Sequence, residues 1–505
     1  MKVPHHLATS VSSSIRRAGS LLLPVSGVLA AAGVWIASQV PEYAVLDDYR
    51  MVSAVKRMRP LHIEGHAGTE LGTGRVVPAL LFDIVWTSVS SVADLWYVRV
   101  IGLSVVALTI AWFLLWIRSV LQISGFAAHF ALAVSGYLVL LLPTVSATTT
   151  WAQKATQLLA FPLAIGAGIF ATSKSLNKKS WMLITLLIFL SAFTYQHITM
   201  VAVFPTALWA GLEHEHSRES QRLRRVAVVS TLAGCSLLVN FLFVRVYSSD
   251  VLKRISGRTW QNRLDELFDF SAKSIHLYVE KHPSLVIVSL ALYVLVVGTS
   301  IWTAGNSSAI RILTSVLFSI GCLLAVTLVS DGDSSYRAVF PIQIVTWIGA
   351  SVLVVHASNT SPRVRLTKYL PVMVLCLSAI WLTNDAHRTL HTRIALANHN
   401  DWRDLKCTLR RVAVEKPQAE VILRLAPITL SGEGAAFSEI GLLARHIGWI
   451  LHDQVDLAVS TTDELNSLNE INFGILDFED VVVDGTTSVS VIDLRQPCSK
   501  RLSGY

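Results

Sequence analysis

The feature that most constrains the fold of this sequence is a succession of apolar blocks, each near the roughly 20 residues that cross a bilayer core. The blocks occupy residues 21–40, 98–117, 127–145, 155–171, 181–194, 198–212, 226–247, 284–301, 312–329, 338–355 and 370–383. Outer-membrane barrels instead show short segments of alternating hydrophobicity. The sequence therefore predicts an α-helical polytopic membrane protein with about eleven transmembrane helices.

Charge is scarce in this chain and is placed between the apolar blocks. Only 15% of the residues are charged, against 52% hydrophobic, and the formal net charge is +8. A basic balance can indicate nucleic-acid binding, but here the Lys and Arg residues lie mostly in short loops, where they orient a membrane protein. We therefore expect no nucleic-acid partner.

The basic loops predict the orientation of the chain, because cytoplasmic loops are enriched in Lys and Arg. Alternate loops carry Arg118, Lys174 with Lys178 and Lys179, the 218–225 run, Arg311, and Arg363 with Arg365 and Lys368. All of them fall on the side of the N-terminus. The pattern predicts a multi-pass protein of the inner or plasma membrane with a cytoplasmic N-terminus and an extracytoplasmic C-terminus.

Two domains are expected. Residues 1–383 form the transmembrane domain, in which 41–97 is a long first outer loop whose apolar part, 76–96, suits a helix lying at the interface. Residues 384–505 are long enough for a small domain. Strand-like patterns at 420–424, 472–478 and 489–494, together with helical patterns at 400–412 and 437–453, predict that this tail is an extracytoplasmic α/β domain.

One stretch of the membrane domain is expected to be broken. Basic loops flank 181–212, so a single pass would place one of them outside. Two short spans interrupted at Tyr195, Gln196 and His197 fit better. Interrupted helices are tolerated where the backbone lines a cavity or is buried in protein, which marks this break as a candidate binding site.

The most informative motif follows the first span. Asp47 and Asp48 are adjacent carboxylates at a membrane boundary, followed by Arg50 and, further on, by Gly74 and Arg75. Burying such carboxylates requires a cation, a metal or a water-filled cavity, and adjacent side chains diverge, so one of the two can face a given reacting atom. The competing interpretation is an acidic helix end exposed to water.

This arrangement resembles the GT-C membrane glycosyltransferases and, within them, the serotype-converting O-antigen glucosyltransferases (Gtr type II). In that family a first span is followed by an outer loop with an acidic pair, an Arg soon after, and a Gly-Arg leading into an amphipathic helix. Tyr195 with Gln196 between short helices and Tyr336 with Arg337 entering a late span are similar as well.

The resemblance implies a hexosyltransferase that moves a sugar, in that family glucose, from a polyprenyl-phosphate carrier to a cell-envelope glycan acceptor such as lipopolysaccharide O-antigen. Asp47 or Asp48 would accept the proton of the acceptor hydroxyl. The departing lipid phosphate gains negative charge, which a guanidinium stabilises. Arg75 and Arg337 are the first candidates for that role, and Arg50 and Lys154 are the next.

Four of these substrate-binding residues have an alternative interpretation. Arg75 could anchor a phospholipid headgroup, as boundary arginines commonly do. Arg337 could pair with Asp331 or Asp333 in the same loop. Tyr195 and Gln196 could be polar contacts between helices rather than contacts to the sugar.

The sequence predicts no dedicated set of metal ligands. His62, Glu64 and His66 in the first outer loop have metal-ligating side chains, but an exposed loop is the better interpretation. No cofactor is implied, and a divalent cation bridging Asp47 and Asp48 stays open.

The main rival function is a transporter or flippase of a lipid-linked saccharide. Such a protein would usually carry ionisable residues near mid-membrane and show repeat symmetry between its halves. The sequence shows no such repeat, and its charges concentrate at the outer boundary. An O-antigen polymerase is a third reading, but it would place its informative loop late in the chain, whereas here that loop comes first.

Overall fold

A computed structural model describes most of the membrane domain and two strands of the tail. The described residues are 22–40, 43, 48, 52, 70–86, 88–89, 91–123, 125–212, 219–247, 283–304, 306–329, 336–360, 369–396, 398–400, 403, 420–424 and 489–493. Asp47, Arg50 and the His62, Glu64 and His66 spacer lie outside this set, and so does most of the predicted α/β domain. Of Arg337 only the backbone is described.

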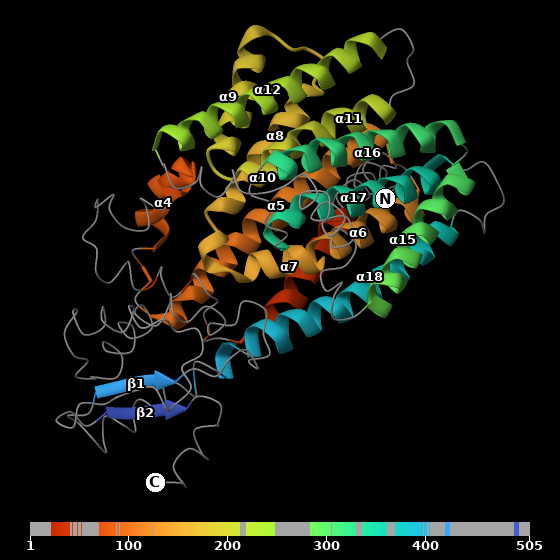
Figure 1. Cartoon of the computed structure of the whole chain (residues 1–505). Coiled ribbons are helices and arrows are strands. Elements are labelled where there is room, and N and C mark those ends of the chain that lie inside the picture. The colour runs from red at the N-terminus through yellow and green to blue at the C-terminus, as the bar shows by residue number, and fades with distance from the viewer. Residues whose placement is uncertain are drawn as a thin grey trace, which may run out of the picture.

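The described part is a bundle of helices packed along a common direction (Figure 1). After a helix at Leu22–Ala37 come α4 (Val76–Trp86), α5 (Leu95–Leu121), α6 (Phe126–Leu140), α7 (Pro143–Thr150), α8 (Ala160–Ala171), α9 (Lys178–Ala192), α10 (Gln196–Thr199), α11 (Val203–Leu212), α12 (Glu219–Tyr247), α15 (Pro283–Ala304), α16 (Asn306–Val329), α17 (Tyr336–Thr360) and α18 (Leu370–His387). Short 3-10 segments η1 (Val92–Asp94), η2 (Ala152–Lys154), η3 (Gln157–Leu159) and η4 (Met200–Ala202) join some of them, and a π-helix, η7 (Arg388–Leu396), extends α18.

Length and hydropathy make this a helical membrane protein. Within the described residues, seven helices are long and apolar enough to cross a bilayer, and the bent pair α6 and α7 would make an eighth. The predicted count of about eleven exceeds this number because several predicted spans form helices shorter than a full crossing. They include Leu22–Ala37, α9 with 15 residues and α11 with 10.

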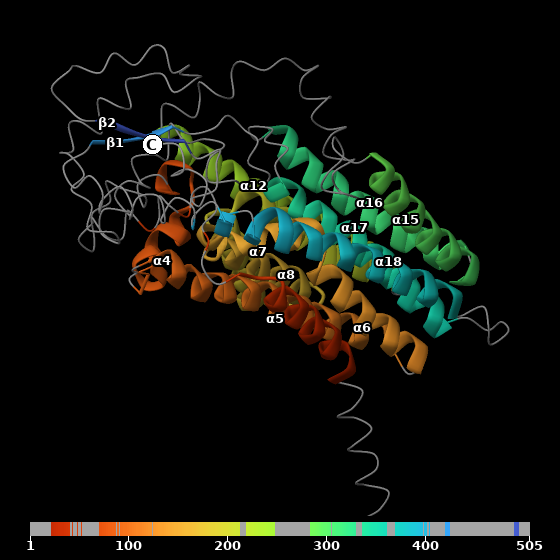
Figure 2. The same cartoon turned by 90° about the horizontal axis from the view of Figure 1, so that it is seen from below.

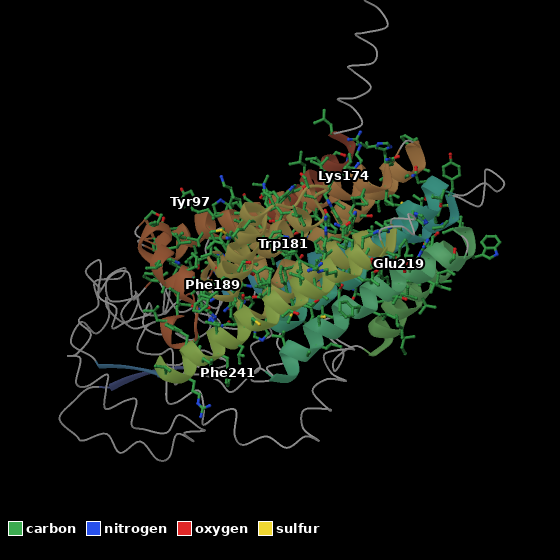
Figure 3. The ribbon with its side chains drawn as sticks, turned by 90° about the horizontal axis from the view of Figure 1, so that it is seen from above. Tyr97, Lys174, Trp181, Phe189, Glu219 and Phe241 are labelled. Carbon is green, nitrogen blue, oxygen red and sulfur yellow. The ribbon has the colours of Figure 1, made fainter. Side chains whose placement is uncertain are left out.

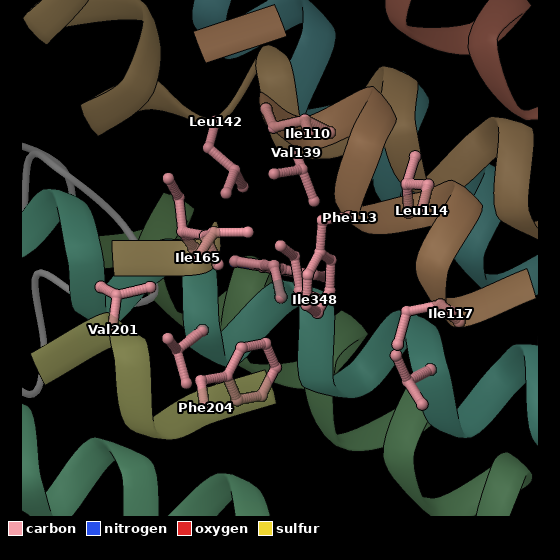
Figure 4. Close-up of a cluster of buried hydrophobic side chains, with 14 of the residues drawn as sticks. Ile110, Phe113, Leu114, Ile117, Val139, Leu142, Ile165, Val201, Phe204 and Ile348 are labelled. Carbon is pink, nitrogen blue, oxygen red and sulfur yellow. The ribbon is translucent and has the colours of Figure 1, made fainter. Parts of the chain in front are cut away.

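The core of the bundle is apolar and closely packed. Figure 4 shows Phe113 of α5 beside Phe204 of α11, with ring centroids 5.6 Å apart, together with Ile110, Ile165 and Ile348. The central helix is α17. Its most apolar 18 residues are all buried, whereas only 22% of the most apolar 18 residues of α15 are buried. The outer helices therefore present their remaining apolar faces to lipid.

Breaks in the helices lie close to the predicted motifs. α9 ends at Ala192, Tyr195 is extended at φ −160° and ψ 108°, and α10 begins at Gln196, so the predicted interruption is present. The helix predicted over 76–96 is wrong in its extent, since α4 ends at Trp86. Asp94 accepts the backbone N–H of Ser91 at 2.8 Å and thereby starts a new helical segment that leads into α5.

The two ends of the bundle differ in character. Figure 3 places Tyr97 and Phe241 at one end and Lys174 and Glu219 toward the other. Figure 2 shows α4 beside the start of α5, at the end where Tyr97 lies. We call this the motif end, because Gly74 and Arg75 directly precede α4. The predicted basic loop at Lys174 lies at the opposite end.

Two strands of the tail are described. β1 (Glu420–Arg424) and β2 (Val489–Asp493) pair in parallel, with Glu420 opposite Val489 and Arg424 opposite Asp493. Both strands fall where the sequence predicted them, and the third predicted strand, at 472–478, lies outside the described residues. Parallel strands require a crossover connection of a dozen or more residues, and 64 residues separate these two along the chain (425–488).

Candidate functional site

A buried ion pair lies at the motif end. Asp48 and Arg99 are both 0% exposed, and the guanidinium Nη2 of Arg99 is 3.2 Å from Oδ2 of Asp48. The other carboxylate oxygen, Oδ1, accepts the backbone N–H of Gln153 at 3.0 Å. The cation that a buried Asp48 requires is therefore Arg99, four residues inside α5.

Arg99 also fixes the chain that leads into the acidic motif. Its guanidinium donates to the carbonyl oxygens of Thr150 at 2.8 Å and Tyr43 at 2.7 Å, and it lies 3.7 Å from the centroid of the Tyr43 ring. Burial raises the pKa of the Tyr43 phenol to about 12, although the nearby Arg99 charge acts in the opposite direction. Tyr43 is thus neutral near pH 7 and provides a stacking surface for the guanidinium.

A second group surrounds Glu70, a buried carboxylate five residues before Arg75. Its Oε2 is 3.3 Å from Nη1 of Arg75. The side-chain amide of Gln157 donates to Oε1 at 3.0 Å, and the Oε1 of Gln157 accepts from Nζ of Lys154, also at 3.0 Å. A continuous chain of polar contacts therefore joins Arg75, Glu70, Gln157 and Lys154.

Both cations of this chain face one aromatic ring. The guanidinium carbon of Arg75 is 5.4 Å from the centroid of the Tyr195 ring, and Nζ of Lys154 is 5.9 Å from the same centroid. These distances lie within the range of cation–π attraction. The Arg75 side chain is 21% exposed, and Lys154 is buried. The described contacts of the Arg75 side chain are thus with Glu70 and the Tyr195 ring.

The turn before α4 is held in place by amide side chains. Gln196 donates to the carbonyl oxygen of Thr73 at 2.7 Å and to Oδ1 of Asn240 at 2.9 Å, and Asn240 donates to the carbonyl oxygen of Gly74 at 2.8 Å. Gly74 has φ +78°, and a Cβ there would lie 2.7 Å from Oδ1 of Asn240. Glycine is therefore required both for the conformation and for the close approach, and it directs Arg75 toward Tyr195.

The structure thus brings together four of the predicted site residues, Arg75, Lys154, Tyr195 and Asp48, in two adjoining groups at the motif end. Gln153, Lys154 and Gln157 link the groups, because all three lie in the segment between α7 and α8. The side-chain amide of Gln196 contacts the turn before α4 and does not face an open site. Arg337 lies in the first turn of α17, which begins at Tyr336, two residues before the predicted span at 338–355.

Sequence reasoning missed Glu70, Arg99, Gln157 and Asn240. Arg99 carried a usable signal, because a charge four residues inside an apolar helix needs a partner. Glu70 was hidden at the end of a polar spacer, and the two amides have no pattern of their own. Their importance follows from contacts across the bundle.

The charge of the site favours an anionic ligand. Arg75, Arg99 and Lys154 contribute three positive charges and Asp48 and Glu70 two negative ones, so these five described side chains carry +1. Within the described part of the chain no three His, Cys, Asp or Glu residues cluster as metal ligands. A phosphate group at the membrane boundary matches this charge.

Comparison with protein-family models, with curated proteins and with solved structures finds no match to this chain.

Proposed function

We propose that this chain is a membrane glycosyltransferase that transfers a hexose from a polyprenyl-phosphate carrier to a cell-envelope glycan on the outer face of the membrane. The proposal includes a topology of about eleven spans, with the motif end and the α/β domain of residues 384–505 outside the cytoplasm. One observation carries it: Arg75 and Lys154 share the Tyr195 ring beside two buried carboxylates.

The proposed reaction uses these residues as follows. A carboxylate accepts the proton of the acceptor hydroxyl, whose oxygen attacks the anomeric carbon of the donor sugar. The bond from that carbon to the phosphate oxygen breaks, and the electron pair stays on the phosphate. The charge of the lipid phosphate thereby grows from about −1 toward −2, and Arg75 and Lys154 stabilise the added charge.

Asp47 is the better candidate for the base. Both oxygens of Asp48 are engaged, one by Arg99 and one by the N–H of Gln153, and the side chain is fully buried. A base must reach the proton that it accepts. In this proposal Asp48 and Arg99 therefore position the loop. Because the side chains of adjacent residues diverge in regular structure, Asp47 is the carboxylate that we propose meets the acceptor.

The placement of buried charge supports an enzyme over a transporter. In the described part of the chain the buried ionisable side chains lie toward the helix ends: Asp48, Glu70, Arg99 and Lys154 at the motif end, and His129, Arg222, Arg225 and His356 toward the other. A translocation path would call for such groups near mid-membrane.

The test is a transfer assay with the full chain in lipid vesicles. Radiolabelled polyprenyl-phosphate glucose and UDP-glucose are offered separately, with a bacterial envelope glycan extract as acceptor, with and without EDTA. The proposal predicts labelled glycan from the lipid donor alone. Transfer from UDP-glucose alone, or no transfer from a panel of polyprenyl-phosphate hexoses, would refute it. Loss of transfer in EDTA would assign a divalent cation to the reaction.

A further inference from the structure

Glu70 occupies the place where the proposed site would receive its phosphate. Its Oε2 is 3.3 Å from Arg75, and its Oε1 accepts from Gln157, whose other amide atom binds Nζ of Lys154. The carboxylate therefore engages one of the two cations directly and the other through a single amide. A phosphate bound by Arg75 and Lys154 would meet this carboxylate at close range.

The pairing of Arg75 with Glu70 leaves donor capacity unused. A guanidinium offers five N–H donors in a planar fork and commonly binds carboxylate or phosphate through two of them. Only Nη1 of Arg75 contacts Glu70, and its Nε is buried without a hydrogen-bond partner among the residues that the structure describes. An oxyanion with several oxygens in a tetrahedral arrangement would use these donors more fully than Glu70 does.

We infer that Glu70 is an internal competitor for the phosphate group, which holds Arg75 and Lys154 when the site is empty and returns to them to expel the lipid-phosphate product. This inference rests on the proposed function. When a lipid phosphate binds, the Arg75 to Glu70 contact breaks and the carboxylate moves away from the cations. After transfer, the re-formed contact favours dissociation of the polyprenyl phosphate.

Glu70 would then set the balance between affinity and turnover. A competing anion that binds the same cations lowers the apparent affinity for phosphate by the fraction of time it occupies them. Gaining or losing one hydrogen bond to a charged partner changes the binding affinity roughly tenfold or more. Removing the charge of Glu70 should therefore tighten phosphate binding about tenfold, lower the donor KM, strengthen product inhibition and reduce kcat when release limits the rate.

The experiment measures the Kd of geranyl phosphate for the full-length protein in nanodiscs by isothermal titration. Glu70→Gln keeps the shape and one acceptor oxygen, replaces the other oxygen with an NH2 donor, and removes the charge. Glu70→Asp keeps the charge but is shorter by one methylene group. Arg75→Ala removes the cation, and Glu219→Gln, an exposed carboxylate at the opposite end, controls for net charge (Figure 3). Thermal unfolding shows which variants are folded.

The expected result is binding about tenfold tighter for Glu70→Gln, a smaller gain for Glu70→Asp, no change for Glu219→Gln, and loss of most of the gain when Glu70→Gln is combined with Arg75→Ala. Unchanged or weaker binding by Glu70→Gln, with Arg75→Ala still impaired, would overturn the role of Glu70 and leave the phosphate site standing. Equal binding by the parent chain and Arg75→Ala would instead refute the phosphate site, and the competitor role with it. If Glu70→Gln does not fold, Glu70→Asp tests the same inference: tighter binding supports the competitor role, and unchanged or weaker binding overturns it.

Discussion

The buried pair of Asp48 and Arg99 makes a sharp prediction about stability. Removing one member of a buried ion pair leaves the other charge without compensation and typically costs about 3–5 kcal/mol. Arg99→Met removes a guanidinium that lies 3.2 Å from a carboxylate that is 0% exposed, so its cost should fall in that range. Asp48→Asn should cost less, about 2–3 kcal/mol, because Arg99 keeps the carbonyl oxygens of Tyr43 and Thr150 as acceptors.

The double variant separates the pair from its surroundings. Arg99→Met also deprives the two carbonyl oxygens of their donor, but this loss occurs equally in the single and the double variant and cancels in a double-mutant cycle. We expect the double variant to lose about 2–3 kcal/mol less unfolding free energy than the two single variants lose when their losses are added. As a control, Asp48→Asn combined with Arg225→Met, at the opposite end, should be additive, since Arg225 binds the carbonyl oxygens of Ala171 and Ser173.

The assay is reversible unfolding by sodium dodecyl sulfate in mixed micelles, followed by tryptophan fluorescence. It gives a free energy of unfolding for the parent chain, both single variants, the double variant and the control. A coupling energy below about 0.5 kcal/mol for Asp48 and Arg99 would mean that the two residues act independently. That outcome would refute the pairing and the positioning role that we assign to Asp48.

Three further predictions address the motif end and the topology. Gly74→Ala should destabilise the protein by about 1–3 kcal/mol and abolish sugar transfer, because its Cβ would strike Asn240 at a positive φ. Gly72→Ala, whose Cβ would meet no atom of the described residues within 4 Å, should leave stability and transfer unchanged. If the two variants lose transfer equally, the contacts of Gln196 and Asn240 with the turn at Gly74 have no role in placing Arg75. A reporter active only in the cytoplasm should be silent when fused after Tyr505, and a signal from it would reverse the assigned orientation. Arg75→Lys should retain part of the turnover and Arg75→Ala almost none, since lysine keeps the charge but loses the planar fork; near-normal turnover in both, with only protein yield changed, would assign Arg75 to lipid anchoring.

The sequence allowed the class of fold and one part of the site to be predicted. Apolar blocks of bilayer length indicate membrane helices whatever their packing, and the local break at Tyr195 follows from the loops that flank it. Gly74 before Arg75 also has a local cause, a turn with positive φ. The exact number of spans did not follow, because short helices such as α9 and α11 depend on their neighbours.

The contacts that build the site could not be read from the sequence. Asp48 and Arg99 are 51 residues apart, Glu70 and Gln157 are 87 apart, and Gly74 and Asn240 are 166 apart. No periodic pattern or spacing rule relates such positions, because packing of the bundle brings them together. The strands at 420–424 and 489–493 illustrate the same limit: their positions follow from local alternation, whereas their parallel pairing depends on the intervening chain.

The central claim is that the motif end carries out sugar transfer with Asp47 as the base and Asp48 as a positioning residue. The most direct measurement is the single-turnover rate of transfer from radiolabelled polyprenyl-phosphate hexose, in vesicles, for the parent chain, Asp47→Asn and Asp48→Asn, alongside the unfolding free energy of each. We predict that Asp47→Asn lowers the rate by several orders of magnitude at unchanged stability, and that Asp48→Asn lowers both rate and stability. Full activity in Asp47→Asn would contradict the claim.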